Sequence, residues 1–201
     1  KVTPERLLMT EIPNDFEHIL KNINIAGKIA KLSKSESNKS FSLDDKNWGW
    51  FNLGDLFTFE KGERLTKPDR IEGDIPLITA GENNNGVSEY ISIENFKDKK
   101  KIFENKITID MFFDVFYHDY KYFSDDNIHT LIPINFELNK YSSLFLVTVL
   151  SKLKYKYAYG RQVRLMRLPL EKIKLPVDLK GNPDWEFMED YIKSLPYSAS
   201  I

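Results

Sequence analysis

The chain has 201 residues, of which 41% are hydrophobic and 13% aromatic, enough to fill the core of one folded domain. It contains no cysteine, which excludes a disulfide scaffold, a zinc ribbon and thiol catalysis, and fits a reducing cytosol. With 29 basic and 30 acidic residues the formal charge is −1, so bulk charge gives no support to a nucleic-acid partner. No apolar run reaches the ~18 residues of a membrane span, and no cleavable leader is visible, so we expect a cytoplasmic protein.

The N-terminal part is predicted to be a helix followed by a linker. Residues 14–33 carry apolar side chains at helical spacing, and Asn14 with Glu17 forms a capping signal. The run Ser33–Ser40 is polar and of low complexity, which is typical of a linker.

A second unit begins near Trp48 and is predicted to consist of short strands separated by turns. The turn signals include Lys61-Gly62, Gly73-Asp74 and the run Asn83–Gly86. The predicted strands are Asp55–Glu60, Ile75–Ala80, Ser88–Ile93, Lys106–Ile109, Val115–Tyr117, Ile128–Pro133 and Val163–Leu168.

Two further helices are predicted, at Tyr141–Leu153 and, between Pro183 and Pro196, at Asp184–Ser194. The predicted class is mixed α/β, with an α+β-like curved mixed sheet and a few helices, flanked by the N-terminal helix and a short C-terminal helix. We expect three parts: residues 1–40 (helical segment and linker), 41–180 (the main domain) and 181–201 (C-terminal helix and tail).

Most catalytic constellations are missing from the sequence. The three histidines, His18, His118 and His129, show no metal-ligand spacing. The run Gly81–Gly86 lacks the Lys-Ser/Thr of a phosphate loop, and no nucleophile elbow occurs. The run Asn182–Trp185 resembles the base-holding loop of amino-methyltransferases only superficially, so we expect no methyltransferase activity in this chain.

A metal-dependent nuclease is the alternative enzyme class. Such enzymes often place an acidic residue before an acid-x-Lys triplet, whose carboxylates hold Mg²⁺. Glu104-Asn105-Lys106, preceded by Asp69, and Asp119-Tyr120-Lys121, preceded by Asp110, have this form. In a chain with 29% charged residues such triplets arise by chance, and solvated loops explain both of them.

The segment Lys152–Arg167 points to nucleic acid. It contains no acidic residue and alternates tyrosines with Lys152, Lys154, Lys156, Arg161, Arg164 and Arg167. Lysines neutralise phosphates, and arginine and glutamine make bidentate contacts to base edges. A solvated edge strand, protected from aggregation by its lysines, is the other interpretation of this composition.

At these residues the chain resembles the target-recognition domains in the specificity subunits of type I restriction–modification systems and of related type II enzymes that combine methylation and cleavage. The resemblance covers roughly residues 48–198. In order, it rests on Trp50–Phe57, Lys61–Arg64, Gly73–Gly81, Asn84–Val87, Ile107–Asp110, Phe116–His118, Tyr157–Arg161, Ile173–Val177 and Gly181–Lys193.

The resemblance implies a module without catalysis that binds one half of a bipartite double-stranded DNA target. Its implied partners are an adenine methyltransferase subunit or fused domain, which would hold S-adenosylmethionine, and a second copy or second recognition domain. A usual specificity subunit has two such domains, whereas one is visible here, which indicates a half-subunit, a fragment or the tail of a fused enzyme. The sequence itself implies no cofactor and no metal for this chain.

Together, composition and resemblance predict the DNA-binding residues Lys154, Lys156, Tyr157, Tyr159, Gly160, Arg161, Arg164, Asn83, Asn84 and Asn85. By matching position, the resemblance places Tyr159–Arg161 and Asn83–Asn85 in loops near DNA. Besides the nuclease, a protein–protein adaptor that uses the helices at 14–33 and 184–194 remains an alternative.

Overall fold

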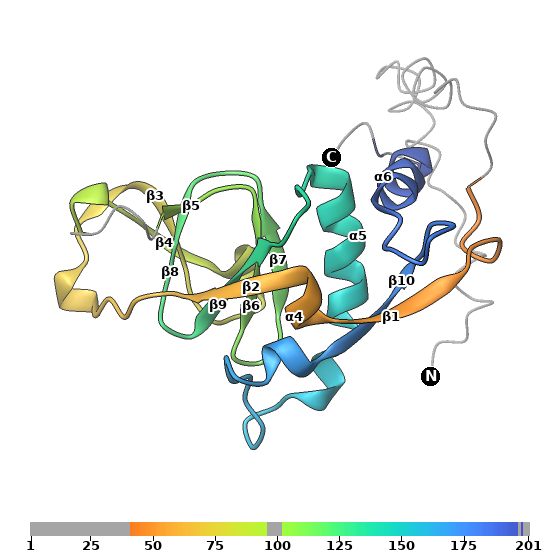
Figure 1. The fold of residues 1–201 in the computed structure, drawn as a ribbon. Coiled ribbons are helices and arrows are strands. Elements are labelled where there is room, and N and C mark those ends of the chain that lie inside the picture. Colours follow the sequence, from red (N-terminus) through yellow and green to blue (C-terminus); the bar gives the residue numbers. More distant parts are fainter. Residues whose placement is uncertain (1–40, 96–101, 197, 199–201) are drawn as a thin grey trace, which may run out of the picture. The chain divides into compact units, whose positions relative to one another are not determined.

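The computed structural model describes residues 41–95, 102–196 and 198. The helix predicted at 14–33 and the linker that follows it lie outside the described residues. Residues Phe41–Lys193 form one compact unit (Figure 1). Among the described residues, no helix has the length and apolar character needed to cross a membrane.

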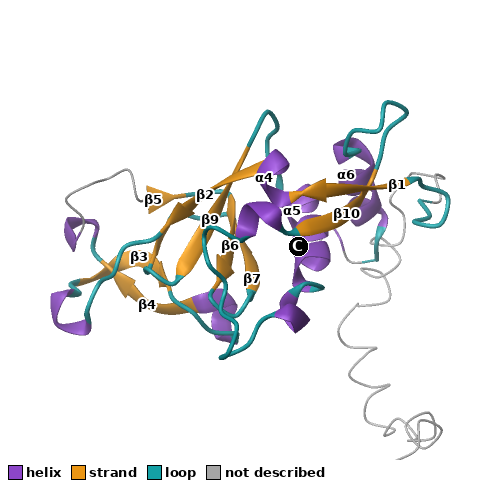
Figure 2. Ribbon diagram, turned by 60° about the horizontal axis from the view of Figure 1, so that its bottom comes forward, coloured by secondary structure: helices purple, strands orange, loops and turns teal. Residues whose placement is uncertain are grey.

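The strands of this unit are distributed over three sheets. A four-stranded antiparallel sheet has the order β2-β9-β6-β7 and a mixed sheet the order β4-β3-β8-β5, in which β3 and β8 run parallel. A third sheet pairs β1 with β10 antiparallel (Figure 2). The strands are β1 Trp48–Asn52, β2 Phe57–Lys61, β3 Glu72–Ile78, β4 Val87–Ile91, β5 Ile102–Phe103, β6 Lys106–Asp110, β7 Val115–His118, β8 Tyr122–Ser124, β9 Ile128–Pro133 and β10 Lys172–Pro176.

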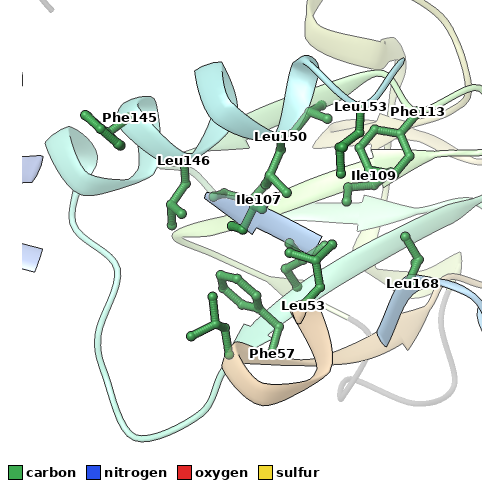
Figure 3. Close-up of a cluster of buried hydrophobic side chains, with 14 of the residues drawn as sticks. Leu53, Phe57, Ile107, Ile109, Phe113, Phe145, Leu146, Leu150, Leu153 and Leu168 are labelled. Atoms are coloured by element: carbon green, nitrogen blue, oxygen red, sulfur yellow. The ribbon is translucent and has the colours of Figure 1, made fainter. Parts of the chain in front are cut away.

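Helix α5, Lys140–Ser151, covers the antiparallel sheet and forms much of the core. It begins at a capping box in which Asn139 and Ser142 exchange side-chain and backbone hydrogen bonds. Leu146 and Leu150 lie on its buried face opposite Ile107 of β6 (Figure 3). Helix α6, Trp185–Ser194, adds Met188 and other residues to the same core. This packing fixes the loops that follow α5 and β6.

The prediction of a mixed α/β fold is confirmed, with the strands divided among several sheets. The predicted strand at Asp55–Glu60 is wrong at its start, because Leu53–Leu56 form a short helix, α4. Leu53 and Leu56 are three positions apart, so both lie on one face of this helical turn, and both are buried. At its start, Asn52 Nδ2 donates a hydrogen bond to Asp55 Oδ2 at 2.8 Å. Strands β1, β5, β8 and β10 are additional to those predicted.

The predicted strand at Val163–Leu168 is also wrong. Val163 and Leu168 are buried, but Leu165 and Met166 between them are exposed, so the burial lacks the alternation of a strand. The segment instead turns, with Arg167 N donating to Arg164 O at 2.8 Å, and continues into the 3₁₀ turn Leu168–Leu170. The edge-strand interpretation of the basic segment fails for the same reason.

Candidate nucleic-acid interface

The basic segment after α5 forms an arch-shaped loop. Its two ends, Tyr157 and Val163, are buried, and we call them the first and the second foot. Residues Lys154–Lys156 make a 3₁₀ turn, and the Tyr157 ring then stacks on Phe113 with centroids 4.8 Å apart. At the other foot, Val163 is buried and its N–H donates to Met111 O at 2.9 Å. Between the feet, Arg161 N donates to Ala158 O at 2.8 Å and closes a tight turn. We call residues 157–163 the arch.

The tip of the arch projects into solvent. The Tyr159 side chain is 87% exposed, and a Cβ added to Gly160 would meet no atom within 4 Å. The tip is the loop at the bottom of Figure 1. Arg161, Arg164 and Arg167 are exposed, and none of them forms an ion pair with another described residue. Cations on a rigidly anchored, protruding turn are well placed to contact an anionic surface.

The lysines at the start of the segment are engaged with carboxylates. Lys154 forms ion pairs with Asp114 and Glu82, and Lys156 Nζ lies 2.6 Å from Glu171 Oε2. The hydrogen bonds to Asp114 and Glu82 raise the pKa of Lys154 above its usual value. These two lysines therefore hold neighbouring loops together in the structure.

Glu171 is the acceptor that anchors the first foot of the arch. Its Oε1 accepts a hydrogen bond from the Tyr157 hydroxyl at 2.6 Å, beside the contact of Oε2 with Lys156. Burial works to raise the pKa of Glu171, but the bonds from Lys156 and Tyr157 outweigh it and lower this pKa. Tyr157 is itself 7% exposed, so its ring supports the arch from inside.

The asparagine loop, residues Gly81–Gly86, has an unusual backbone. Asn84 and Asn85 adopt the left-handed conformation with φ of 49° and 51°, and Gly86 follows with φ of 79°. Asparagine and glycine tolerate this region better than other residues, which explains their use here. The turn is closed by Thr79 N donating to Gly86 O at 2.8 Å, and Asn83, Asn84 and Asn85 are exposed.

The structure brings the asparagine loop and the arch together around the turn after β6. Lys154 links Glu82 of the asparagine loop to Asp114 of that turn. The rings of Phe112 and Tyr159 lie 5.0 Å apart. The sequence did not indicate Phe112, Asp114 or Glu82 as part of this surface, because their partners are distant in the chain.

Asp110, at the end of β6, holds the backbone of this turn through hydrogen bonds to its side chain. Its Oδ1 accepts hydrogen bonds of 2.8 Å from the N–H groups of Phe112 and Asp114. Burial raises the pKa of the Asp110 carboxyl above its usual value, against the opposing effect of these backbone donors. Its Oδ2 accepts the N–H of Gly81 at 3.1 Å, so both oxygens of this carboxylate hold backbone groups in place.

The other candidate catalytic groups are Glu104 and Asp119 of the two acid-x-Lys triplets and the buried His118. Glu104 and Asp119 line one broad cavity, but no group of three or more acidic or histidine residues within the described part of the chain is arranged to hold a metal ion. His118 Nε2 lies 2.9 Å from Thr108 Oγ1 and its Nδ1 3.1 Å from the Tyr120 hydroxyl. Burial lowers the pKa of His118 to about 4.

Comparison with known proteins identifies the family to which this chain belongs. Residues 45–196 match the family model of the type I restriction modification DNA specificity domain. This chain belongs to that family. A curated relative, described as the type II restriction enzyme BgcI specificity subunit S.BcgI of Heyndrickxia coagulans, is 36% identical to this specificity domain over 151 residues. The match covers 75% of the chain but 44% of the relative, so the chain spans less than half of that protein's length.

Solved structures show the same fold. The type I restriction–modification S subunit from M. genitalium superposes with a TM-score of 0.55 at 18% identity, covering 89% of this specificity domain's chain and 50% of the other. The HsdS subunit from Thermoanaerobacter tengcongensis gives 0.51 at 13% identity, covering 88% and 47%. The family match and the curated relative confirm the resemblance noted in the sequence, and the solved structures confirm the fold.

Proposed function

We propose that this chain recognises one half of a bipartite duplex DNA target and confers its sequence specificity on a partner methyltransferase or endonuclease. The observation that carries the proposal is the exposed arch tip with Arg161, which forms no ion pair with another described residue, in a chain of the DNA specificity domain family. Side chains that protrude from a rigid turn can enter a groove of DNA, where base edges carry the sequence information.

The contact surface that we propose has two parts. Tyr159, Gly160, Arg161 and Arg164 of the basic segment contact DNA directly, and Asn83–Asn85 approach it from the neighbouring loop. These loops are held in place by Lys154, which pairs with Asp114 and Glu82. Glu171 adds to this support by binding Lys156 and Tyr157. The arginine guanidinium and the asparagine amide supply the bidentate donors and acceptors that base edges require.

The proposed partners follow from the family and from the incomplete coverage of its relatives. The chain spans 44% of the described specificity subunit and about half of the solved ones, which fits one recognition domain acting beside a second domain or a second copy. The methyltransferase subunit or fused domain would bind S-adenosylmethionine. The chain itself would carry no catalysis.

Two assays test this function. In the first, the chain is mixed with a randomised duplex library and bound DNA is sequenced after repeated selection. We expect enrichment of a short motif, whereas retention of unselected sequence alone would overturn the proposal. In the second, the chain is incubated with plasmid, Mg²⁺ and S-adenosylmethionine. We expect neither cleavage nor methylation, and activity that disappears in Glu104→Ala or Asp119→Ala would instead establish the nuclease.

A further inference from the structure

Beside the second foot of the arch, the surface encloses a small polar cavity of about 120 Å³. It lies between the end of β2, the turn before β9 and the segment that leaves the arch. Its lining residues are Lys61, Met111, Asp126, Asn127, His129, Gln162, Val163, Arg164 and Leu165. We call it the His129 cavity.

The backbone around the His129 cavity is closely held. Lys61, at the end of β2, and His129, near the start of β9, are direct cross-strand partners, so their side chains lie on one face of the sheet. The next residue, Gly62, packs so tightly that a Cβ there would lie 2.2 Å from the backbone oxygens of Ser124 and Asp125. Val163, hydrogen-bonded to Met111, fixes the opposite wall.

His129 is the unexplained group of this cavity. The residue is 5% exposed, and neither of its ring nitrogens has a hydrogen-bond partner among the described residues. Nδ1 is shielded from solvent, so Nε2 is the ring nitrogen that can reach the cavity. An unpaired buried polar atom costs about 1–3 kcal/mol, so such groups in native proteins are usually satisfied by a ligand or water. Burial, and then the charge of Lys61, lower the pKa of His129 to about 4, so at neutral pH the imidazole is a neutral donor and acceptor.

The surrounding charges favour an anion. Lys61 and Arg164 bring two positive charges to the cavity, against the one negative charge of Asp126. The Asp126 carboxylate accepts a hydrogen bond of 3.2 Å from Asn127 Nδ2, and Arg164 Nη2 donates to Gln162 Oε1 at 3.3 Å. A second hollow that shares Asp126 and Asn127 is lined by Arg64, Lys67 and Arg70, with Asp125 beside them and Arg70 paired with Glu89.

The shape of the surface indicates that the occupant of the cavity is a phosphate and not a base. On duplex DNA the phosphates project outward, whereas base edges are recessed in the grooves. A recess in the protein therefore fits a phosphate, and a protruding turn such as the arch tip fits a groove. The cavity lies next to the arch along the same chain segment, so both can engage one duplex.

We propose that the His129 cavity binds a backbone phosphate of duplex DNA, with Arg164 and Lys61 neutralising its charge and His129 donating a hydrogen bond from Nε2. This inference rests on the proposed function and adds a phosphate site that fixes how the arch is placed against the bases. The contact carries no sequence information of its own.

The test measures binding of the 201-residue chain to a random-sequence duplex over a range of salt concentrations. Arg164→Ala is expected to lower the salt slope by about one unit and to weaken binding about eight-fold at ~0.1 M salt, equally for all sequences. His129→Phe, which keeps a ring of similar size, should weaken binding with the slope unchanged. Lys180→Ala, in the exposed turn before α6, is the control for loss of one charge and should bind like the parent chain.

A direct readout follows the imidazole itself. In nuclear magnetic resonance of ¹⁵N-histidine-labelled protein, the His129 nitrogens should shift on addition of the duplex. The pKa of His129 should rise from about 4, because a nearby phosphate stabilises the imidazolium. His118, held by Thr108 and Tyr120, serves as the internal reference.

The outcomes distinguish this site from the proposed function. If Arg161→Ala weakens DNA binding while Arg164→Ala and His129→Phe do not, the phosphate site is wrong and the DNA-recognition function stands. If Arg164→Ala weakens binding to the selected motif alone, Arg164 contacts a base and the phosphate assignment is overturned. If the chain binds no duplex, both proposals fail together.

Discussion

The backbone N–H of Gly81 donates a hydrogen bond of 3.1 Å to Oδ2 of Asp110. The other oxygen of this carboxylate accepts the N–H groups of Phe112 and Asp114. One buried side chain thus joins the start of the asparagine loop to the turn whose Phe112 contacts the arch tip. The geometry of the proposed DNA surface depends on this connection.

Replacing Asp110 by asparagine should therefore destabilise the chain. The amide keeps one acceptor oxygen and turns an NH₂ group toward a backbone donor, so we expect a loss of about 1–3 kcal/mol in the free energy of unfolding. Urea denaturation at neutral pH measures this loss. Asp119→Asn, at an exposed position paired loosely with Lys140, should change stability by less than about 0.5 kcal/mol. Equal stability of the two variants would show that the Asp110 bonds contribute nothing.

The strands and turns that depend on local pattern could be predicted from the sequence. The alternation in Lys106–Asp110 and the turn chemistry of Asn83–Gly86 are local signals, and the structure has a strand and a left-handed turn there. Val163–Leu168 contains the apolar residues of a strand, but the burial of Val163 depends on Met111, which is far away in the sequence. Such tertiary anchoring leaves no local pattern.

The same limit applies to the candidate site. Counting basic residues identified the segment around the arch, because clustered charge is visible in sequence. It did not distinguish Lys154, which is paired with two carboxylates from other loops, from Arg161, whose guanidinium forms no ion pair with a described residue. His129 and Lys61 become neighbours through the pairing of β2 and β9, so their cavity could not be found by spacing.

Lys154→Ala should separate a supporting role from a phosphate contact. Loss of the ammonium leaves the largely buried Asp114 without its partner, so we expect a loss of stability of about 1 kcal/mol. The amide resonances of Asn83–Asn85 should shift, because Glu82 is released, and the salt slope of DNA binding should stay the same. Lys152→Ala, at an exposed lysine two residues earlier, is the matched control. A slope lowered by about one unit in Lys154→Ala would make Lys154 a direct phosphate contact.

Stability should decline as the pH falls below neutrality because of the buried histidines. Burial lowers the pKa of His118, and burial with Lys61 that of His129, from 6.5 to about 4. The unfolded chain therefore takes up protons from about pH 6.5 downward, while the folded chain resists until about pH 4. The stabilisation is present above pH 6.5 and is lost progressively as the pH falls through this window.

Urea denaturation at intervals between neutral pH and about pH 5 tests this expectation. In this upper part of the window the carboxylates with lowered pKa, such as Glu171, contribute little, because they are ionised in both states. His118→Gln, which retains polar atoms toward Thr108 and Tyr120, should flatten the pH dependence. A pH dependence identical to that of the parent chain would mean that His118 titrates normally in the folded protein.

Arg161 provides the sharpest test of base recognition. It lies beside Gly160 at the exposed tip of the arch, and its backbone is held by the bonds with Ala158. If its guanidinium contacts the edge of a guanine, Arg161→Ala should weaken binding to the selected motif by about 1–3 kcal/mol and binding to random duplex much less. Arg161→Lys should not restore the affinity, because a lysine ammonium lacks the planar fork that makes two parallel hydrogen bonds.

Competition binding with labelled motif and unlabelled random duplex measures both losses in one experiment. Because the tip is solvent-exposed, the variants should unfold at the same urea concentration as the parent chain, which separates a binding effect from a folding effect. Equal losses on both duplexes would make Arg161 a phosphate contact, with specificity supplied elsewhere on the surface. If neither duplex binds more weakly, the arch does not touch DNA, and the asparagine loop becomes the next position at which to search for base contacts.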